Sequence, residues 1–207
     1  VVEPLGKDLN GWKTNGSLED SKWTVGVAKV DPDNIRRLVV EPLGDAAPEL
    51  VTCEGHGQDI YTEQKFGDCV IELELMVPLG SNSGIYLMGE YEVQVLDSYG
   101  REDVGPGDIG GLYGAQAPSQ NAAKKPGEWQ KFVIDFQAPR FDGDKKISNA
   151  VFRKVTLNGK VIHKNVEMYQ QTPGGVAGRE APTGPLMFQG NHGGVAYRNI
   201  KIHVPTE

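Results

Sequence analysis

The sequence has little cysteine, few aromatic residues and no long apolar segment. Aromatic residues make up 8% of its 207 residues. No run of about 18 apolar residues is present, so no segment has the composition of a membrane-spanning helix. No signal-peptide pattern is visible either. The chain starts with Val1 rather than methionine, which fits an upstream segment removed in maturation or by the choice of the expressed segment.

Basic residues are outnumbered by acidic ones. The chain has 21 lysine and arginine residues against 28 aspartate and glutamate residues, which gives a formal net charge of −7. Nucleic-acid phosphates are bound by lysine and arginine, so this balance argues against a nucleic-acid partner. It is compatible with a neutral sugar ligand, although it mainly favours solubility.

Cys53 and Cys69 are the only cysteines. They can form a disulfide if their strands are neighbours, which would indicate an oxidising compartment. Two separately buried thiols are an equally open interpretation. No CxxC motif and no cysteine–histidine spacing typical of a zinc site occurs.

Glycine and proline, in contrast, are abundant. The chain has 27 glycines and 13 prolines, and 38% of its residues are apolar, which indicates many turns. No helical periodicity extends beyond about ten residues, and no internal repeat is found. We therefore predict an all-β fold, a sandwich of two antiparallel sheets with little helix, as a single domain over residues 1–207.

Several segments show the two-residue alternation of half-buried strands. Residues 68–77 (DCVIELELMV) and 129–136 (WQKFVIDF) alternate in this way. Asn158-Gly159 lies between two such runs and predicts a hairpin with a type I′ turn. The glycine-rich segments 100–111 and 170–185 predict long loops, of the kind that form rims or lids.

The most informative segment is Ser81–Tyr99 (SNSGIYLMGEYEVQVLDSY), which predicts a β-hairpin with a polar second strand. The strand alternates, and its apolar residues are Tyr91, Val93 and Val95. Glu92 and Gln94 therefore share the opposite face. Asp97 has the other parity and joins that face only through a bulge or at the end of the strand. Such a face suits a polyol ligand, but it also suits an ordinary strand with a wetted face.

Five blocks of sequence resemble the 3-keto-disaccharide hydrolase family, a bacterial family long catalogued as a domain of unknown function. The blocks are NSGIYLMGEYEVQVLDSYG, GGLYGAQAP, GEWQKFVIDFQAPRFD, VTLNGKVIHKN and GPLMFQGNHGGVAYRNIKI. The resemblance covers a core of about residues 5–204. It implies a concanavalin A-like jelly-roll sandwich, a sugar-facing concave sheet, and a periplasmic, envelope or secreted setting.

Two positions depart from the family pattern. The family often has Gln-Asp-His near its carboxyl end, where this chain has Gln189-Gly190-Asn191-His192. The missing acid weakens any metal or acid role at that place. Cys69 stands where the family often has an aromatic residue, which we interpret as a change in the core.

The resemblance implies a definite chemistry. In a 3-keto glycoside, the ketone acidifies the hydrogen on C2, so a base can remove it and the group at C1 can leave by elimination. Water then adds to the product. Such a site needs a base, an acid for the leaving oxygen, and an electrophile for the enolate oxygen, a role that a divalent metal could fill. No set of three well-spaced metal ligands is visible in the sequence.

Three residues are candidates for catalysis. Glu92 is the preferred base, because partial burial of a mid-strand carboxylate raises its pKa; a solvated strand glutamate is the alternative. His192, in the turn Gly190–Gly194, could act as acid, base or ligand, or be an exposed loop residue. Asp97 could serve the site or cap a turn.

Five further residues are candidates for substrate binding, each with a plain structural alternative. Their polar or aromatic side chains could contact hydroxyl groups or stack on a sugar ring. The alternatives are cross-strand pairing, a salt bridge to Asp142 or Asp144, turn capping and core packing. The five residues are Gln94, Arg140, Asn82, Tyr86 and Tyr113.

Three other functions stay open. A two-carboxylate glycosidase would need Asp97 or Glu90 as the partner of Glu92, at a separation of about 5–5.5 Å or 6.5–9.5 Å. A carbohydrate-binding module would bind sugar without turnover. A structural sandwich in an envelope assembly would have no pocket near Glu92.

Overall fold

The computed structural model describes residues 1–206, which form an all-β sandwich of two antiparallel sheets and a separate two-stranded hairpin. No helix long and apolar enough to cross a membrane is found in the described part of the chain. The strands are β1 (Trp12–Lys13), β2 (Trp23–Asp31), β3 (Asn34–Glu41), β4 (Glu49–Thr52), β5 (Ile60–Phe66), β6 (Cys69–Met76), β7 (Asn82–Leu87), β8 (Tyr91–Leu96), β9 (Gln130–Gln137), β10 (Arg140–Asp142), β11 (Lys145–Ser148), β12 (Ala150–Leu157), β13 (Lys160–Met168), β14 (Gly184–Phe188) and β15 (Val195–His203).

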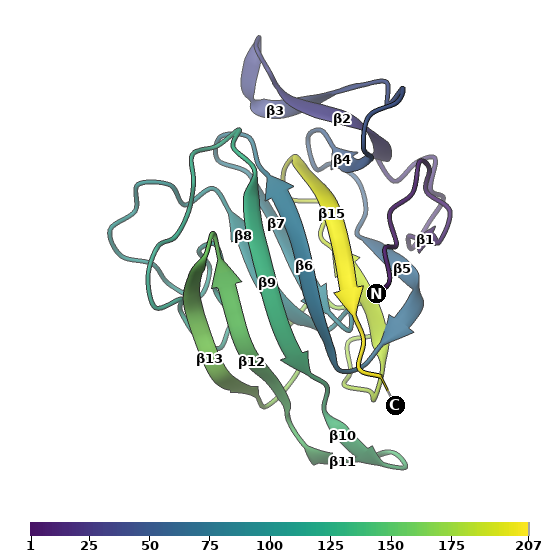
Figure 1. The fold of residues 1–207 in the computed structure, drawn as a ribbon, viewed down its shortest axis with the longest axis vertical. Helices are drawn as coiled ribbons and strands as arrows, with labels where there is room; N and C mark the ends of the chain where they lie inside the picture. Colours follow the sequence, from purple (N-terminus) through teal and green to yellow (C-terminus); the bar gives the residue numbers. More distant parts are fainter. Residues whose placement is uncertain (207) are drawn as a thin grey trace.

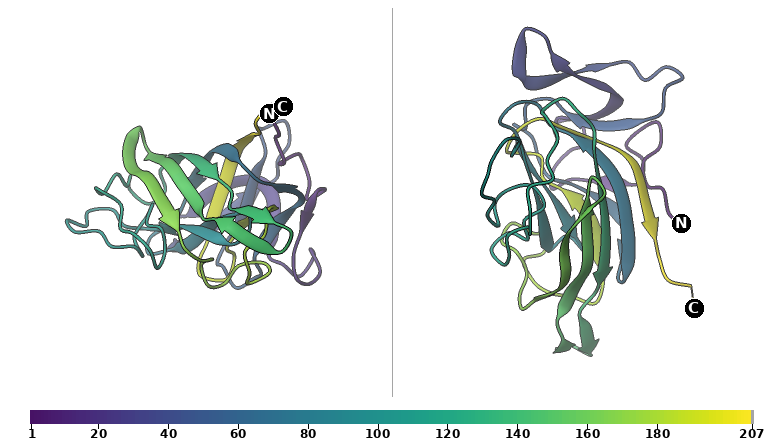
Figure 2. Two further views of the ribbon diagram at one scale, coloured as in Figure 1. Left: turned by 90° about the horizontal axis from the view of Figure 1, so that it is seen from below. Right: turned by 60° about the vertical axis from the view of Figure 1, so that its left-hand side comes forward.

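The two sheets form the layers of the sandwich. The smaller sheet has the order β1-β5-β14-β7-β8, and the larger has the order β13-β12-β9-β6-β15-β4-β2-β3. The β2–β3 hairpin lies at one end of the molecule and the β10–β11 hairpin projects from the other (Figures 1 and 2). Val2 pairs with Ile202, which places the two ends of the chain side by side. The predicted fold class is confirmed.

The core lies between the sheets, where the alternating strands bury one face each. β6 contributes Ile71, Leu73 and Leu75, while Glu72 and Glu74 stay partly exposed on its other face. Phe188 of the smaller sheet stacks on Tyr197 of the larger at 3.8 Å between ring centroids. Such aromatic contacts between layers contribute beyond the area that they bury.

The predicted hairpin at Asn158-Gly159 is confirmed, and its geometry explains the two residue types. It joins β12 to β13, and the two residues have φ angles of 52° and 81°. Both angles lie in the left-handed region that a type I′ turn needs, which asparagine and glycine tolerate best.

Cys53 and Cys69 are not joined by a disulfide. Cys69 is buried in the main core, whereas Cys53 packs at the edge of a second, smaller cluster formed by Ala28, Leu38, Val51, Met76 and Ala196. Burial raises the pKa of the Cys69 thiol to about 12. Of the two interpretations left open by the sequence, the separate thiols are the one observed.

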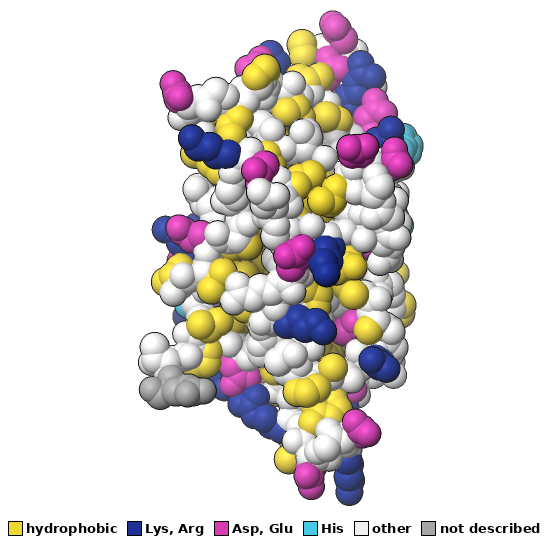
Figure 3. Space-filling model, turned by 90° about the vertical axis from the view of Figure 1, so that its right-hand side faces the viewer, with side chains coloured by type: hydrophobic (Ala, Val, Ile, Leu, Met, Phe, Trp, Pro, Cys, Tyr) yellow, Lys and Arg dark blue, Asp and Glu magenta, His cyan; other side chains and the backbone are white. Residues whose placement is uncertain are grey.

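Charged side chains of both signs are interspersed on the side of the molecule near the chain termini (Figure 3). Lysine and arginine do not gather there into a continuous surface.

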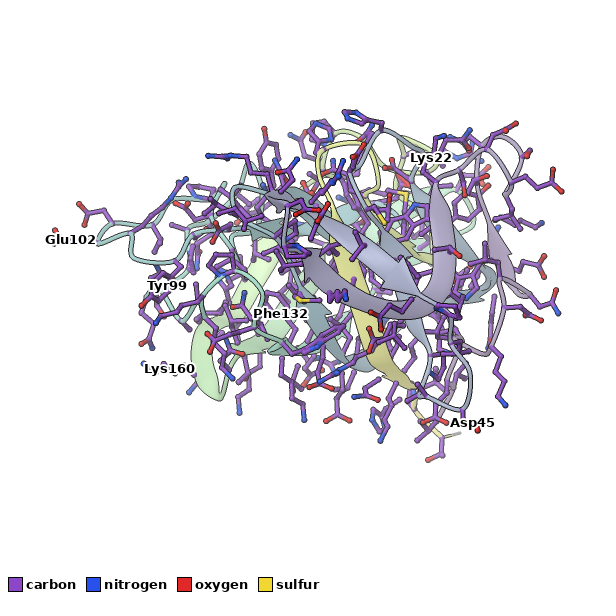
Figure 4. The ribbon with its side chains drawn as sticks, turned by 90° about the horizontal axis from the view of Figure 1, so that it is seen from above. Lys22, Asp45, Tyr99, Glu102, Phe132 and Lys160 are labelled. Carbon is purple, nitrogen blue, oxygen red and sulfur yellow. The ribbon has the colours of Figure 1, made fainter. Side chains whose placement is uncertain are left out.

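Two loops cover the free edge of β8, the last strand of the smaller sheet. Gln94 of β8 exchanges backbone hydrogen bonds with the loop after it, donating to Gly111 (2.8 Å) and accepting from Gly110 (2.8 Å). The second loop reaches β8 through Thr172, whose N–H donates to the carbonyl of Glu90 (2.7 Å). Seen from above, the first loop projects far from the sandwich at Glu102, whereas Phe132 lies in the interior (Figure 4). The covered edge is where the candidate site forms.

Candidate functional site

A cavity of about 300 Å³ lies over the outer face of the smaller sheet, at β7 and β8. The valines of β8 face the core, so its alternate residues point outward into this cavity. The cavity brings together six of the eight site residues predicted from the sequence. Its lining consists of Asn82, Tyr86, Glu92, Gln94, Tyr113, Pro173, Gly174, Gln189 and His192.

Glu92 is the one carboxyl group among the residues that line this cavity. Only 3% of its surface is exposed, and its Oε2 atom has no hydrogen-bond partner among the described residues. Burial raises the pKa of its carboxyl group to about 7, and the negative charge of Asp59 adds to this effect, while the Tyr86 hydroxyl opposes it. A carboxyl group with this pKa is close to half ionised at neutral pH and can act as a base.

Gly84 makes room for this carboxylate. It lies on β7, next to β8, and a Cβ atom at this position would meet Oε2 of Glu92 at 2.0 Å. Since any side chain there would displace the carboxylate, glycine sets the place of the acid. Within the block Asn82-Ser83-Gly84, Gly84 therefore contributes to the site by leaving the space that the Glu92 carboxylate occupies.

Neighbouring polar groups are oriented by hydrogen bonds. Nε2 of Gln94 donates to Oδ1 of Asn82 (3.2 Å), so the Nδ2 donor of Asn82 is left for other acceptors. The hydroxyl of Tyr86 donates to the carbonyl of Pro173 (3.1 Å) and is held beneath the covering loop. An amide donor such as the Nδ2 of Asn82 suits a sugar hydroxyl or an enolate oxygen.

His192 lies at the exposed mouth of the cavity, where its Nδ1 pairs with the side chain of Asn191. Its positive charge acts on Asp59 in the direction that lowers the pKa of that carboxyl group. Asp59 also accepts a hydrogen bond from the N–H of Gly190 (3.0 Å), which fixes the turn that carries the histidine.

Asp59 was missed by sequence reasoning. It is a single acid before β5, without a motif around it, and it is 131 positions away from the glycine that it binds. Burial raises the pKa of its carboxyl group. Thr172 and Gln189 were missed for the same reason, because the chain brings them to Glu92 only through long-range folding.

Asp97 lies outside the cavity lining. Its Oδ2 accepts a hydrogen bond from the N–H of Gly80 (2.8 Å), and its own N–H donates to the carbonyl of Ser81 (2.9 Å). It thus caps the turn before β7, as expected from its parity on the strand. This position does not fit a catalytic role.

Arg140 is also remote from the cavity. It begins β10, in the hairpin that projects from one end of the sandwich (Figure 1), and its guanidinium group binds both carboxylate oxygens of Asp68 at 2.7 and 2.8 Å. The expected role in substrate binding does not fit this place. The observed partner, Asp68, was not among the salt-bridge partners considered from the sequence.

Glu90 holds the loop that roofs the cavity, which we call the strap (residues 170–183). Its buried carboxylate accepts hydrogen bonds from the N–H groups of Ala177 (3.0 Å) and Gly178 (2.8 Å). Burial raises the pKa of this carboxyl group, and the strap N–H groups oppose that rise. Glu90 is therefore committed to the strap and not free to act as a second catalytic acid.

We expect Glu90→Ala to loosen the strap and to slow any reaction in the cavity. The change leaves two N–H groups without their acceptor, at a cost of about 1–3 kcal/mol each where they stay buried. Hydrogen exchange should accelerate at residues 172–178 and not in β6 or β9. Glu102→Ala, at an exposed loop tip, is the matched control; equal exchange in the two variants would contradict the role of Glu90.

The cavity contains one carboxylate, one imidazole and several amides as potential metal ligands. Within residues 1–206, no group of three or more histidine, cysteine, aspartate or glutamate side chains is placed to hold a metal ion. A metal there would rely on Glu92 and His192 together with amide oxygens.

Comparisons with known proteins indicate one family. A family model described as a 3-keto-alpha-glucoside-1,2-lyase-like domain matches residues 5–203. A crystallised candidate glycosyl hydrolase from Parabacteroides distasonis is 29% identical, with a TM-score of 0.72 over 97% of this chain and 81% of its own. A second candidate glycosyl hydrolase from that organism shares the fold, at 19% identity and a TM-score of 0.65 over 97% of this chain and 91% of its own. No curated protein matches the chain.

Proposed function

Since the chain belongs to the family of 3-keto-alpha-glucoside-1,2-lyase-like domains, we propose that it cleaves 3-keto glycosides by elimination followed by hydration. The observation that carries this proposal is the buried carboxyl group of Glu92, with a pKa of about 7, in the cavity over the smaller sheet. A base poised near neutral pH is what removal of a weakly acidic C–H proton requires.

The first step breaks the bond between C1 and the leaving oxygen. The Glu92 carboxylate takes the proton from C2, and the electron pair of that bond forms an enolate with the C3 ketone. The enolate then re-forms the ketone, creates the C1–C2 double bond and expels the group at C1. His192, at the mouth of the cavity, gives its proton to the leaving oxygen.

The second step adds water across the new double bond. Neutral His192 takes a proton from water, whose oxygen bonds to C1, and the Glu92 carboxylic acid returns a proton to C2. One water is consumed, a 3-keto sugar and an alcohol are formed, and both side chains regain their starting protonation states. The amide of Asn82 and the hydroxyl of Tyr113 are the neutral donors assigned to the enolate oxygen.

A glycosidase with two carboxylates has less support. Both partners that the sequence offers for Glu92 are engaged elsewhere, Asp97 with Gly80 and Glu90 with the strap. The remaining nearby acid, Asp59, is not part of the cavity lining and is bound to Gly190.

Cleavage in heavy water distinguishes these mechanisms. With a 3-keto α-glucoside in D₂O, elimination and hydration should place solvent deuterium on C2 of the released 3-keto sugar, detectable by NMR and mass spectrometry. The unoxidised glucoside, whose C2 hydrogen is not acidic, should not react.

Two results would count against the proposal. One is release of the 3-keto sugar with its original C2 hydrogen fully retained, which would indicate direct displacement at C1. The other is comparable cleavage of the unoxidised glucoside. A glycoside already deuterated at C2 serves as the matched control, since its label should be lost in ordinary water.

A further inference from the structure

A second and larger cavity, of about 550 Å³, adjoins the one that contains Glu92. It lies between the loop Tyr113–Gln116 and residues 165–173, which include the end of β13 and the start of the strap. Tyr113 and Pro173 line both cavities, so the two spaces share a wall. The second cavity therefore lies directly beside the one over Glu92, with these two residues at the boundary.

Two exposed aromatic side chains face this second cavity. Among residues 1–206, the exposed large aromatic residues are Tyr99 (51% exposed), Tyr113 (46%) and Tyr169 (75%). Two of these three line the same cavity. Tyrosine presents an apolar ring together with a polar hydroxyl, which matches the mixed surface of a sugar ring.

The wall that carries Tyr169 is held in place. Its carbonyl oxygen accepts a hydrogen bond from Nζ of Lys146 (3.0 Å), and the same Nζ is paired with Glu180 at 2.7 Å. Three residues further on, the hydroxyl oxygen of Thr172 accepts the N–H of Glu92 (3.0 Å). The tyrosine is thus exposed on a backbone held at its own carbonyl and again three residues further on, which reduces the entropy lost when a ligand binds.

The rest of the lining is mixed, with polar side chains beside a few apolar ones such as Val166 and Met168. Side-chain amides and one carboxylate surround the two tyrosines, namely Gln116, Asn165, Glu167, Gln170 and Gln171. Such groups offer hydrogen-bond donors and acceptors to the hydroxyl groups of a ligand. The volumes of the two cavities fall in the range of about 300–1,000 Å³ that is usual for small-molecule sites.

We propose that the second cavity is the subsite for the leaving group and that it binds a second pyranose ring stacked on Tyr169. This inference rests on the proposed function, because it takes the Glu92 cavity as the place of the 3-keto ring. It assigns the leaving-group ring to a defined place in the structure, and it makes Tyr169 a determinant of leaving-group specificity.

The test compares two substrates that differ only in the leaving group. Tyr169→Ala should lower the ratio of kcat/KM for 3-keto-maltose to kcat/KM for methyl 3-keto-α-glucoside about 10-fold, mainly through KM, since one aromatic contact is worth about that factor. Tyr99→Ala is the matched control, because it removes an exposed tyrosine outside the cavity. An unchanged ratio in Tyr169→Ala would overturn the proposal.

A binding experiment separates this proposal from the proposed function. Glu92→Gln protein is titrated with maltose and with methyl α-glucoside, with and without Tyr169→Ala, and followed by NMR. Tighter binding of maltose that is lost with Tyr169 would support the subsite even if the wild-type protein cleaves neither 3-keto glycoside. Equal binding of the two sugars would refute the subsite even if cleavage occurs.

Discussion

Replacement of Glu92 with glutamine is expected to abolish cleavage of 3-keto glycosides and to stabilise the fold above pH 7. Loss of a general base typically costs about 10²–10⁴-fold in rate. The stabilisation arises because the buried carboxylate has an oxygen without a hydrogen-bond partner in the described residues, and its burial disfavours the charged form. In this one variant, the loss of rate measures the role of Glu92 as a base. The gain in unfolding free energy measures the cost of burying its carboxylate.

The direction of the pH dependence follows from the pKa of Glu92. Its value is about 7 in the folded protein against an ordinary value of 4.5. The folded state therefore binds more protons than the unfolded state between these values, and wild-type stability falls as the pH rises from 4.5 to 7. The full difference corresponds to about 3 kcal/mol. Activity should rise over the upper part of the same range, as the base becomes ionised.

Urea unfolding of both proteins at pH 5 and pH 8 measures this effect. The gain in unfolding free energy from Glu92→Gln should be larger at pH 8 than at pH 5. Glu72→Gln is a suitable control, because a hydrogen bond from His203 lowers the pKa of Glu72, so its removal should bring no stabilisation at pH 8. A gain for Glu92→Gln that is the same at both pH values would refute the raised pKa.

Gly84→Ala is expected to lower kcat/KM about 100-fold while leaving the fold intact, since a displacement of about 1 Å in a catalytic group can cost that much. The new Cβ would lie 2.0 Å from Oε2 of Glu92, so the carboxylate must move. The atom displaced is the flexible end of a side chain, and the sheet can stay as it is. The unfolding free energy should remain within about 1 kcal/mol of wild type.

The matched control is Gly107→Ala, where a Cβ would meet nothing within 4 Å. It should keep both activity and stability. A fully active Gly84→Ala protein would show that the reaction does not depend on the position of Glu92 seen here. A crystal structure of the variant would show directly where the carboxylate has moved.

Local pattern predicted the part of the site that lies on one hairpin. The two-residue period placed Glu92 and Gln94 on one face and set Asp97 apart, and the structure has this arrangement. The two-residue alternation could not show whether that face of β8 is exposed to solvent or covered by another part of the chain. The cover is the strap, and its Thr172 accepts the N–H of Glu92, which is 80 positions away in the chain.

The remaining errors and omissions also come from long-range contacts. Arg140 has the residue type of a sugar ligand, but its position depends on Asp68, 72 residues away. Asp59 has no motif at all, and its influence on Glu92 exists only after β5 has joined the smaller sheet. The chemical type of each side chain could be read from the sequence. Which of these side chains lie in the same cavity could not.

The strap and the catalytic base are fastened to the same strand. Glu90 of the turn before β8 holds the strap at Ala177 and Gly178, and the N–H of Glu92 holds it at Thr172. The wall residue Tyr169 lies just before these anchors and contributes to none of them through its side chain. Substrate range can therefore be re-engineered, in evolution or in the laboratory, by exchanging residues between or before the anchors while the strand that performs the chemistry stays the same.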